Sequence, residues 1–200
     1  MKLDPGLTMD QHVRSIVSTC NYHLQAFRHI RPLLDQKVAE SVGRSIVMSR
    51  LDYCNALLAG TTKNNLNLLQ KVQNQCIRTV CQLPYRASTT SPRLDLHWLP
   101  VKERVNYKLS VITYKTMSTN QPTYLRNLLT EYVPARTLRS SIDDKKLVVP
   151  LTRSKLQERS FSFAAPSCWN SLPLFIRQSP TLQSFKSSLK RFLFSSSTSS

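Results

Sequence analysis

Glycine is almost absent from this sequence of 200 residues, which contains only three. Phosphate-binding loops and dinucleotide folds need several glycines, because their backbone passes close to phosphate and takes positive φ angles. The chain also has only 11 acidic residues, which is few for a site that holds metal ions with several carboxylates. We therefore expect neither a nucleotide-cofactor fold nor any bound metal or cofactor.

Closely spaced cysteine pairs and long apolar runs are missing as well. The five cysteines include no C-x-x-C pair, and most of them lie in apolar stretches. This usage is typical of reduced, buried thiols in an intracellular protein. No signal-peptide pattern and no apolar run of membrane-spanning length is visible. The sequence predicts an intracellular chain, cytoplasmic or nuclear, with no membrane span.

Basic residues dominate the charge. The chain has 28 Lys and Arg against 11 Asp and Glu, a net charge of +17. Residues 1–100 carry net +6 and residues 101–200 carry net +11. An excess of this size repels itself unless it faces a polyanion, and nucleic acid is the first candidate. An anionic membrane surface and a protein merely kept soluble by its charge are the alternatives.

The spacing of apolar residues predicts a mainly α fold. Apolar residues recur at three-residue and four-residue steps, which predicts helices near 10–29, 35–58, 62–81 and 100–117 that form a bundle, and a short helix at 124–129. Thr8 is the expected N-cap of the first helix, and Gly60 the expected stop of the second. The expected buried faces are Val13, Ile16, Val17, Cys20, Leu24 and Phe27; Val38, Val42, Ile46, Cys54 and Leu57; Leu66, Leu69, Val72, Cys76 and Val80; and Val105, Leu109 and Ile112.

The character of the chain changes after residue 130. Residues 131–160 are polar and basic, and an irregular arm is expected there with a possible short strand or hairpin at 147–149. An aromatic segment at 161–172 precedes a final amphipathic helix that ends near 194, with Phe185, Leu189 and Phe192 on one face. We expect a helical region over 1–130, the arm, aromatic segment and last helix over 131–194, and a disordered tail of Ser and Thr over 195–200.

Two clusters are weak candidates for chemistry. Polymerases hold two metal ions with paired carboxylates on a turn between apolar strands, but Asp143 and Asp144 are flanked by Ser and Lys, as in a solvated loop. Cys76, Cys81 and His97 are a poor zinc site, because two cysteines five apart on one helix point about 140° away from each other. We therefore expect no enzyme activity and no small-molecule substrate.

Binding of RNA or DNA is the function that the charge favours. Positive charge along a surface neutralises phosphates and releases counterions, with little sequence specificity. Tyr85 and Tyr132 lie near basic residues and are candidates to stack on unpaired bases. The candidate nucleic-acid-binding residues are Arg44, Arg50, Lys71, Arg78, Lys102, Arg104, Arg136, Arg139, Lys145, Lys146, Arg153, Lys155 and Arg159.

An ordered series of short strings carries a family resemblance over almost the whole chain. The strings are SRLDYCN at 49–55, LLAG at 57–60, LQKVQN at 69–74, LHWLPV at 96–101, YK at 114–115, PTYL at 122–125, LRSS at 138–141, FAAP at 163–166, WNSLP at 169–173 and FK at 185–186. In this order and spacing the chain resembles the region that follows the polymerase in non-LTR retrotransposons, the long interspersed elements of the jockey and chicken-repeat type.

The resemblance implies a role without catalysis. The family's enzyme is a reverse transcriptase whose aspartates lie in a palm with a Tyr/Phe-x-Asp-Asp turn. By resemblance that palm lies before residue 1, so no catalytic residue carries over to this sequence. The resemblance implies that these residues form the thumb and the C-terminal helical region, which grip the template–primer duplex and the element RNA.

Other functions remain open. A helical protein-interaction module without a nucleic-acid role is one alternative, and a non-functional relic is another. A missing palm would leave apolar surface uncovered, so self-association through exposed apolar side chains is also expected.

Overall fold

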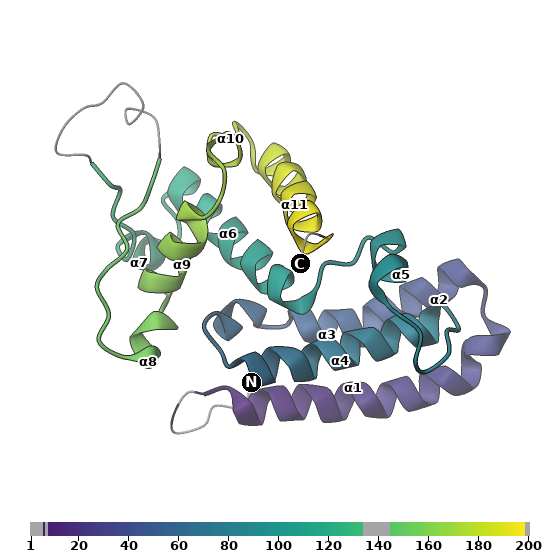
Figure 1. Ribbon diagram of the computed structural model, residues 1–200. Helices are drawn as coiled ribbons and strands as arrows, with labels where there is room; N and C mark the ends of the chain where they lie inside the picture. Colours follow the sequence, from purple (N-terminus) through teal and green to yellow (C-terminus); the bar gives the residue numbers. More distant parts are fainter. Residues whose placement is uncertain (1–5, 7, 134–144, 199–200) are drawn as a thin grey trace. The chain divides into compact units, whose positions relative to one another are not determined.

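The computed structural model describes residue 6 and residues 8–133 and 145–198, and it is mainly helical, as the sequence predicts (Figure 1). The chain divides into two compact units, Met1–Val105 and Asn106–Ser200. The division near residue 130 that composition suggests is a boundary of another kind, between helices and arm, and it stays a prediction. No helix in the described part is both long enough and apolar enough to cross a bilayer.

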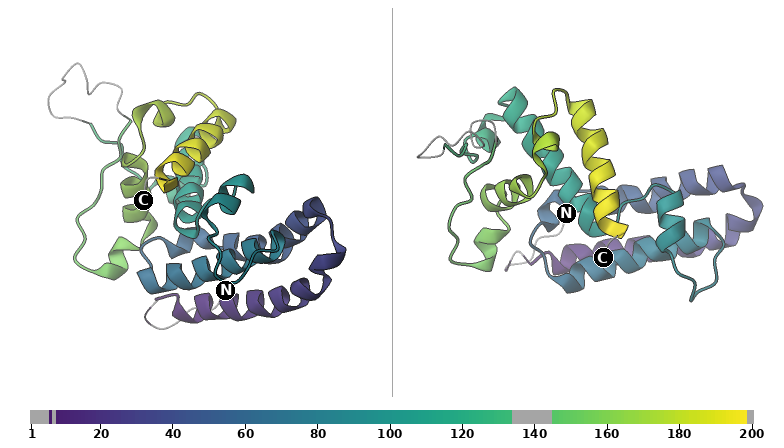
Figure 2. Two further views of the ribbon diagram at one scale, coloured as in Figure 1. Left: turned by 45° about the vertical axis from the view of Figure 1, so that its right-hand side comes forward. Right: turned by 45° about the horizontal axis from the view of Figure 1, so that its top comes forward.

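The first unit is built around two long parallel helices, α1 and α4, which lie side by side in Figures 1 and 2. At one end, Asn65 of α4 donates a hydrogen bond to the Asp10 carboxylate at the start of α1, over 2.7 Å. At the other end, Arg31 donates to the Val80 carbonyl where α4 ends, over 2.7 Å and 2.9 Å. The elements of this unit are α1 (Asp10–Ile30), η1 (Arg31–Leu33), α2 (Gln36–Gly43), the π-helical η2 (Arg44–Met48), α3 (Ser49–Asp52), η3 (Asn55–Leu58), α4 (Lys63–Val80), α5 (Thr90–Asp95) and the start of α6 (Val101–Thr119).

The apolar faces predicted for α1 and α4 are largely confirmed. Cys20 and Leu24 of α1 are completely buried, and so are Leu69 and Cys76 of α4. Val17 and Leu66 are only half-buried, at the edges of their stripes. The seam between the two helices therefore follows the three-residue and four-residue spacing of the sequence.

The single helix expected at 35–58 is wrong in both continuity and face. The helix widens into a π turn at η2 and ends at Asp52, and Cys54 then takes a left-handed conformation with φ of 55°. Val38 and Leu57, expected to be buried, are exposed. The buried side chains belong instead to Ala39, Gly43, Val47, Met48 and Leu51. In α2 the buried positions are the small residues Ala39 and Gly43, and the larger side chain of Val38 lies exposed beside them.

Gly43 permits the close approach of α2 to α4. A Cβ atom at this position would lie 2.9 Å from Val80 Cγ2 and 3.2 Å from Cys76 Sγ. Both distances are shorter than ordinary van der Waals contact. Helix α2 can therefore sit this close to α4 only because residue 43 has no side chain.

Local polar groups fix the helix ends. Thr62 caps α4 by accepting a hydrogen bond from the Asn65 N–H over 3.3 Å, and Asp35 caps α2 through Val38 N–H. Gly60 has φ of 71° after η3, the left-handed stop that the sequence predicts. The N-cap of α1 is Met9, with φ of 65°, rather than Thr8. The Thr8 hydroxyl instead accepts from the Asp10 N–H over 3.3 Å.

The second unit contains the remainder of α6 and a cluster of aromatic rings. Tyr114 stacks on Phe185 with 4.4 Å between ring centroids, and Trp169 stacks on Phe185 at 5.8 Å. Phe185 and Leu189 of the last helix are fully buried, as predicted, while Phe192 is half-buried. The other elements of this unit are α7 (Thr123–Arg126), α8 (Lys155–Glu158), α9 (Phe161–Asn170), α10 (Leu174–Arg177) and α11 (Leu182–Thr198).

The strand or hairpin expected at 147–149 is reduced to one β-bridge between Glu131 and Leu147, and no strand is present in the described ranges. Helix α9 holds this segment in place. The Asn170 amide donates to the Leu147 carbonyl over 2.7 Å and accepts from the Leu147 N–H over 2.9 Å. The Trp169 indole N–H donates to the Lys145 carbonyl over 2.7 Å.

The last helix is longer than the sequence suggests. We expected disorder from residue 195, but α11 continues to Thr198. The hydroxyls of Ser195 and Ser196 donate to the Phe192 carbonyl over 2.8 Å and 2.7 Å. Serine side chains that bond back to the preceding turn in this way satisfy their own polarity within the helix.

Candidate functional site

The basic residues predicted to bind nucleic acid in the first unit differ in how free their charge is. Arg44 pairs with Glu40 at 2.5 Å, and Arg104 forms a two-pronged ion pair with Asp52. Lys71 and Lys102 are exposed. A phosphate would compete with a carboxylate at the two arginines but not at the two lysines.

Arg50 is tied to its own surroundings. Its guanidinium donates to the Ile46 carbonyl over 2.6 Å and lies 3.0 Å from His23 Nε2 of α1. It is half-buried. Arg50 therefore joins α3 to α1, which leaves fewer of its N–H groups for a ligand than an exposed arginine has.

The candidates in the second unit lie around the bridge and before α9. Lys145, Lys146, Arg153 and Lys155 are exposed, and Arg159 is half-buried. Arg136, Arg139 and the pair Asp143 and Asp144 fall outside the described residues.

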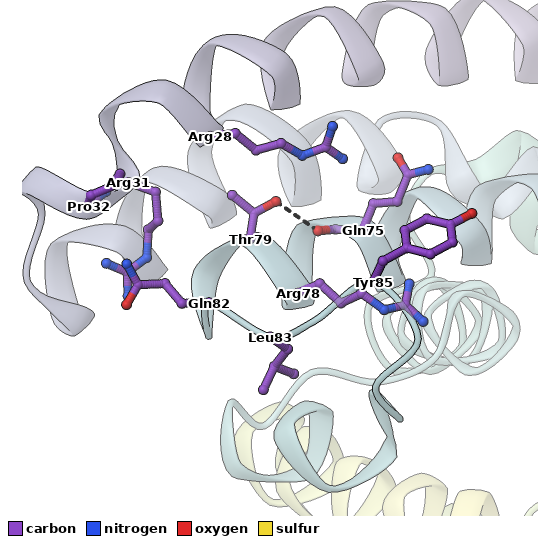
Figure 3. A pocket seen from close by; sticks show the side chains of 9 residues that line it. All are labelled: Arg28, Arg31, Pro32, Gln75, Arg78, Thr79, Gln82, Leu83 and Tyr85. Atoms are coloured by element: carbon purple, nitrogen blue, oxygen red, sulfur yellow. Dashed lines mark hydrogen bonds between the residues drawn. The ribbon is translucent and has the colours of Figure 1, made fainter.

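A pocket of about 440 Å³ opens where α1 and α4 end together. Figure 3 shows its lining from close by. Three residues are basic (Arg28, Arg31, Arg78), three are neutral and polar (Gln75, Thr79, Gln82), and three are apolar or aromatic (Pro32, Leu83, Tyr85). Among the described residues, no acidic side chain contributes to this lining, which brings three cations to one concave surface.

The parallel course of α1 and α4 places the arginines there. Arg28 is in the last turn of α1 and Arg78 in the last turn of α4. Basic residues are favoured at these positions, because the carbonyls at a helix C-terminus carry about half a negative charge. Since the two helices are parallel, their basic ends meet at one place.

Arg31 supports the floor of the pocket. Its side chain is only 6% exposed, and besides Val80 it donates to the Leu34 carbonyl over 2.8 Å and to Gln36 Oε1 over 2.7 Å. These bonds satisfy the last carbonyl of α4 and tie the turn after α1 to it. The charge of Arg31 remains in the pocket, but its hydrogen-bonding capacity is largely used.

Arg28 and Arg78 are the two pocket cations that remain accessible for binding. Arg28 is exposed and Arg78 half-buried, and the Arg78 guanidinium donates from Nε to the Ala87 carbonyl over 3.3 Å. Within the described ranges, neither arginine forms an ion pair with a carboxylate. Tyr85 is 84% exposed at the same opening. The site thus offers guanidinium groups and an aromatic ring to one ligand.

Sequence reasoning identified half of this constellation. It selected Arg78 for its charge and Tyr85 for stacking, but it missed Arg28 and Arg31. The only sequence signal for those two was the group of basic residues Arg28, His29 and Arg31 at the end of the first helix. Basic residues are common at any helix C-terminus, so this group indicates a binding site only once α4 is known to end beside it. Of the other candidates in the first unit, Arg44, Arg50, Lys71, Lys102 and Arg104 do not line this pocket.

Three thiols of the first unit, those of Cys20, Cys76 and Cys81, are unsuited to nucleophilic chemistry. Burial raises the pKa of Cys20 to about 11 and that of Cys76 to about 12, so that both remain protonated near neutral pH. Burial also raises the pKa of Cys81, against a smaller lowering by Gln36 and Arg31. In the part of the chain that is described, no cluster of His, Cys, Asp and Glu is arranged to hold a metal ion.

Comparison with known proteins adds no assignment. No family model, no curated protein and no solved structure matches this chain.

Proposed function

We propose that this chain binds nucleic acid through its phosphates and catalyses no reaction itself. The observation that carries the proposal is the pocket in which Arg28, Arg31 and Arg78 converge, with no carboxylate among the described residues that line it. Its setting is a chain with net charge +17. Guanidinium groups bind phosphate oxygens with two parallel hydrogen bonds, which are strengthened by the opposite charges.

Other exposed cations of each unit supply further phosphate contacts in the proposal. Lys71 and Lys102 in the first unit and Lys145, Lys146, Arg153 and Lys155 in the second are exposed cations. Each cation that neutralises a phosphate releases bound counterions, which is a gain that falls as salt rises. Such contacts fix position on a strand and read no sequence.

The family resemblance gives this function its context. The ordered strings between SRLDYCN and FK suggest that the chain corresponds to the thumb and C-terminal helical region of a non-LTR retrotransposon reverse transcriptase. In that context the bound nucleic acid is the template–primer duplex or the element RNA. A polymerase palm encoded in frame directly upstream of Met1 would support this origin, and an unrelated upstream sequence would oppose it.

Fluorescence anisotropy with labelled oligonucleotides tests nucleic-acid binding. We expect the logarithm of the association constant to fall linearly with the logarithm of salt concentration, with a slope of about −0.7 to −0.9 for each phosphate neutralised. Removing one phosphate-binding cation should make the slope shallower by about one such unit. Absence of binding at about 50 mM salt, or affinity independent of salt, would reject the proposal.

Self-association is the second candidate, because three apolar side chains are exposed near the turn between α1 and α2. Leu33 is 85% exposed, Ile30 48% and Val38 43%. A second copy of the chain could cover these side chains, which would make the protein a helical interaction module. Sedimentation velocity should then show a concentration-dependent dimer that Leu33→Ser weakens. A monomer at all concentrations would exclude this alternative.

A further inference from the structure

The lining of the arginine pocket is more specific than general phosphate binding requires. A phosphate group needs only the cations, yet the pocket also presents the exposed ring of Tyr85 and the half-buried side chain of Gln75. In Figure 3, Tyr85 and Gln75 lie close to Arg78, with Arg28 across from them, while Arg31 and Gln82 occupy the other side. Charge and a planar surface therefore occur together on one side of the pocket.

We infer that this pocket binds one unpaired nucleotide of a single strand, with its phosphate on Arg28 and Arg78 and its base on Tyr85. This inference rests on the proposed nucleic-acid function and names the form of nucleic acid that this site takes. A base in a duplex is stacked on both faces and cannot enter a concave site without leaving the stack. An unpaired base has both faces free, and an aromatic ring binds it with little regard to sequence.

The negative ends of two helices oppose anion binding here, so the balance of charge needs to be weighed. The C-termini of α1 and α4 each contribute about half a negative charge. Together they offset about one cation. Arg31 bonds to the Val80 carbonyl and compensates this effect at the end of α4. Arg28 and Arg78 remain as a net positive pair, which suits a phosphodiester with its single charge.

Gln75 adds a group that can contact a base edge. Its backbone carbonyl accepts from the Thr79 hydroxyl over 2.9 Å, while no bond of its side-chain amide is found among the described residues. An amide offers a donor and an acceptor side by side. It can therefore bind the exposed edge of a base that lies on Tyr85. The volume of about 440 Å³ is in the range of sites that hold a small organic ligand.

Fluorescence anisotropy with two oligonucleotide probes that carry the same fluorophore tests the inference. The probes are a single-stranded oligouridylate of about ten nucleotides, the length scale of a single-strand site, and a blunt RNA duplex. We expect Tyr85→Leu to weaken the single strand about tenfold, which corresponds to the loss of one stacked base. The duplex should lose less than twofold, and Tyr85→Phe should behave as the unsubstituted chain because it keeps the ring.

The two pocket arginines are tested with a pair of substitutions, and the control removes the same number of positive charges elsewhere. Arg28→Gln with Arg78→Gln should weaken the single strand at least fivefold more than Arg14→Gln with Lys63→Gln does. Arg14 and Lys63 are exposed residues near the opposite ends of the same two helices. Both double variants change the net charge equally, so any difference between them reports the pocket. Circular dichroism of each variant verifies that it is folded.

The outcomes separate this inference from the proposed function. Salt-dependent binding of both probes with no selective effect of Tyr85→Leu or of the pocket double variant would overturn the inference and leave the proposed function intact. No binding of either probe would reject both. Photo-crosslinking with a 5-iodouridine oligonucleotide should label the peptide that contains Tyr85, and labelling confined to other peptides would overturn the inference. A phosphotyrosine peptide that binds while both nucleic-acid probes fail would reassign the pocket to a protein ligand.

Discussion

Gly43 limits how α2 and α4 can pack. Its φ of −57° is ordinary for a helix, so alanine would fit the backbone and gain about 1 kcal/mol in helix propensity. The added methyl group would however lie 2.9 Å from Val80 Cγ2, in a part of the core where Val80 is fully buried. Overpacking of this kind costs about 1–3 kcal/mol. Sterics and propensity thus act in opposite directions at this residue.

We predict that Gly43→Ala lowers the free energy of unfolding by about 1–2 kcal/mol, because the clash outweighs the gain in propensity. Urea unfolding followed by circular dichroism measures the change. Val80→Ala supplies the control, since it removes the methyl group that clashes. In a double-mutant cycle the two substitutions should be less destabilising together than their sum. Simple additivity would show that Val80 is not the limiting contact.

The buried thiols make a prediction about chemical modification. The thiolate is the reactive form, and burial holds the pKa of Cys20 at about 11 and that of Cys76 at about 12. At pH 8 the folded chain should therefore leave both unmodified by iodoacetamide, and their reactivity should rise as pH increases toward these values. Guanidinium chloride should expose both cysteines. Peptide mass spectrometry measures each site, and rapid modification in the folded chain would contradict their burial.

At the scale of the element, the sequence predicts helices best where large apolar residues make the seam. In α1 and α4 the buried positions are mostly Leu, Val, Ile, Phe and Cys, so the apolar stripe is the buried stripe. In α2 the seam is made by Ala39 and Gly43, which carry little hydrophobic signal. The face was therefore predicted one residue away from the true one. The π turn at η2 has no counterpart in a strict 3.6-residue period and was not predictable from it.

The segment before Val149 was predicted only in part, as a possible short strand or hairpin at 147–149 within an irregular arm. Its basic, polar sequence predicts an irregular arm, yet Leu147 is only 2% exposed and is bonded on both backbone groups by Asn170. The Asn170 side chain on α9 thus forms the two backbone hydrogen bonds that a neighbouring strand would otherwise form with Leu147. Such a bond between residues 23 apart leaves no trace in local periodicity.

Asn170→Ala should release this segment. It leaves the Leu147 N–H and carbonyl without their partner, at a cost of about 1–3 kcal/mol for a buried polar group. We expect faster hydrogen exchange at the Leu147 amide and a lower free energy of unfolding. Ser171→Ala is the matched control, because Ser171 is exposed and, among the described residues, its hydroxyl bonds only to the Cys168 carbonyl of α9. Equal effects of the two substitutions would show that the paired bonds contribute nothing.

For the molecule as a whole, the net charge could be predicted from the sequence, but which basic residues are neutralised by ion pairs could not. Net charge +17 follows from composition, whereas the pairing of Arg44 with Glu40 and of Arg104 with Asp52 depends on folding. Arg104 and Asp52 are 52 residues apart. The convergence of Arg28 with Arg78 likewise depends on two helices being parallel. The net charge thus follows from the sequence alone, whereas the grouping of charges into a binding site depends on the fold.

This excess of charge predicts a salt effect on stability. Like charges destabilise the folded state, and salt at 0.1 M largely screens exposed charges that lie more than about 10 Å apart. We expect the Tm to rise by about 2–4 °C between low and moderate salt if screening contributes about 1 kcal/mol. Scanning calorimetry measures the rise. Replacing the exposed residues Lys37, Lys63, Lys71 and Lys102 by Gln should reduce it, and an unchanged or falling Tm would contradict the idea.

The parallel pairing of α1 with α4 sets an order of events during synthesis. Arg31 is separated from its acceptor at Val80 by 49 positions, so α1 leaves the ribosome well before the helix that covers its apolar face. At about 5–20 residues per second that delay lasts about 2–10 seconds. During it, Leu24 and Phe27 have no permanent cover. The nascent chain therefore passes through an interval in which a chaperone can recognise its exposed apolar side chains. The interval ends when the C-terminus of α4 has been translated and Val80 accepts hydrogen bonds from Arg31.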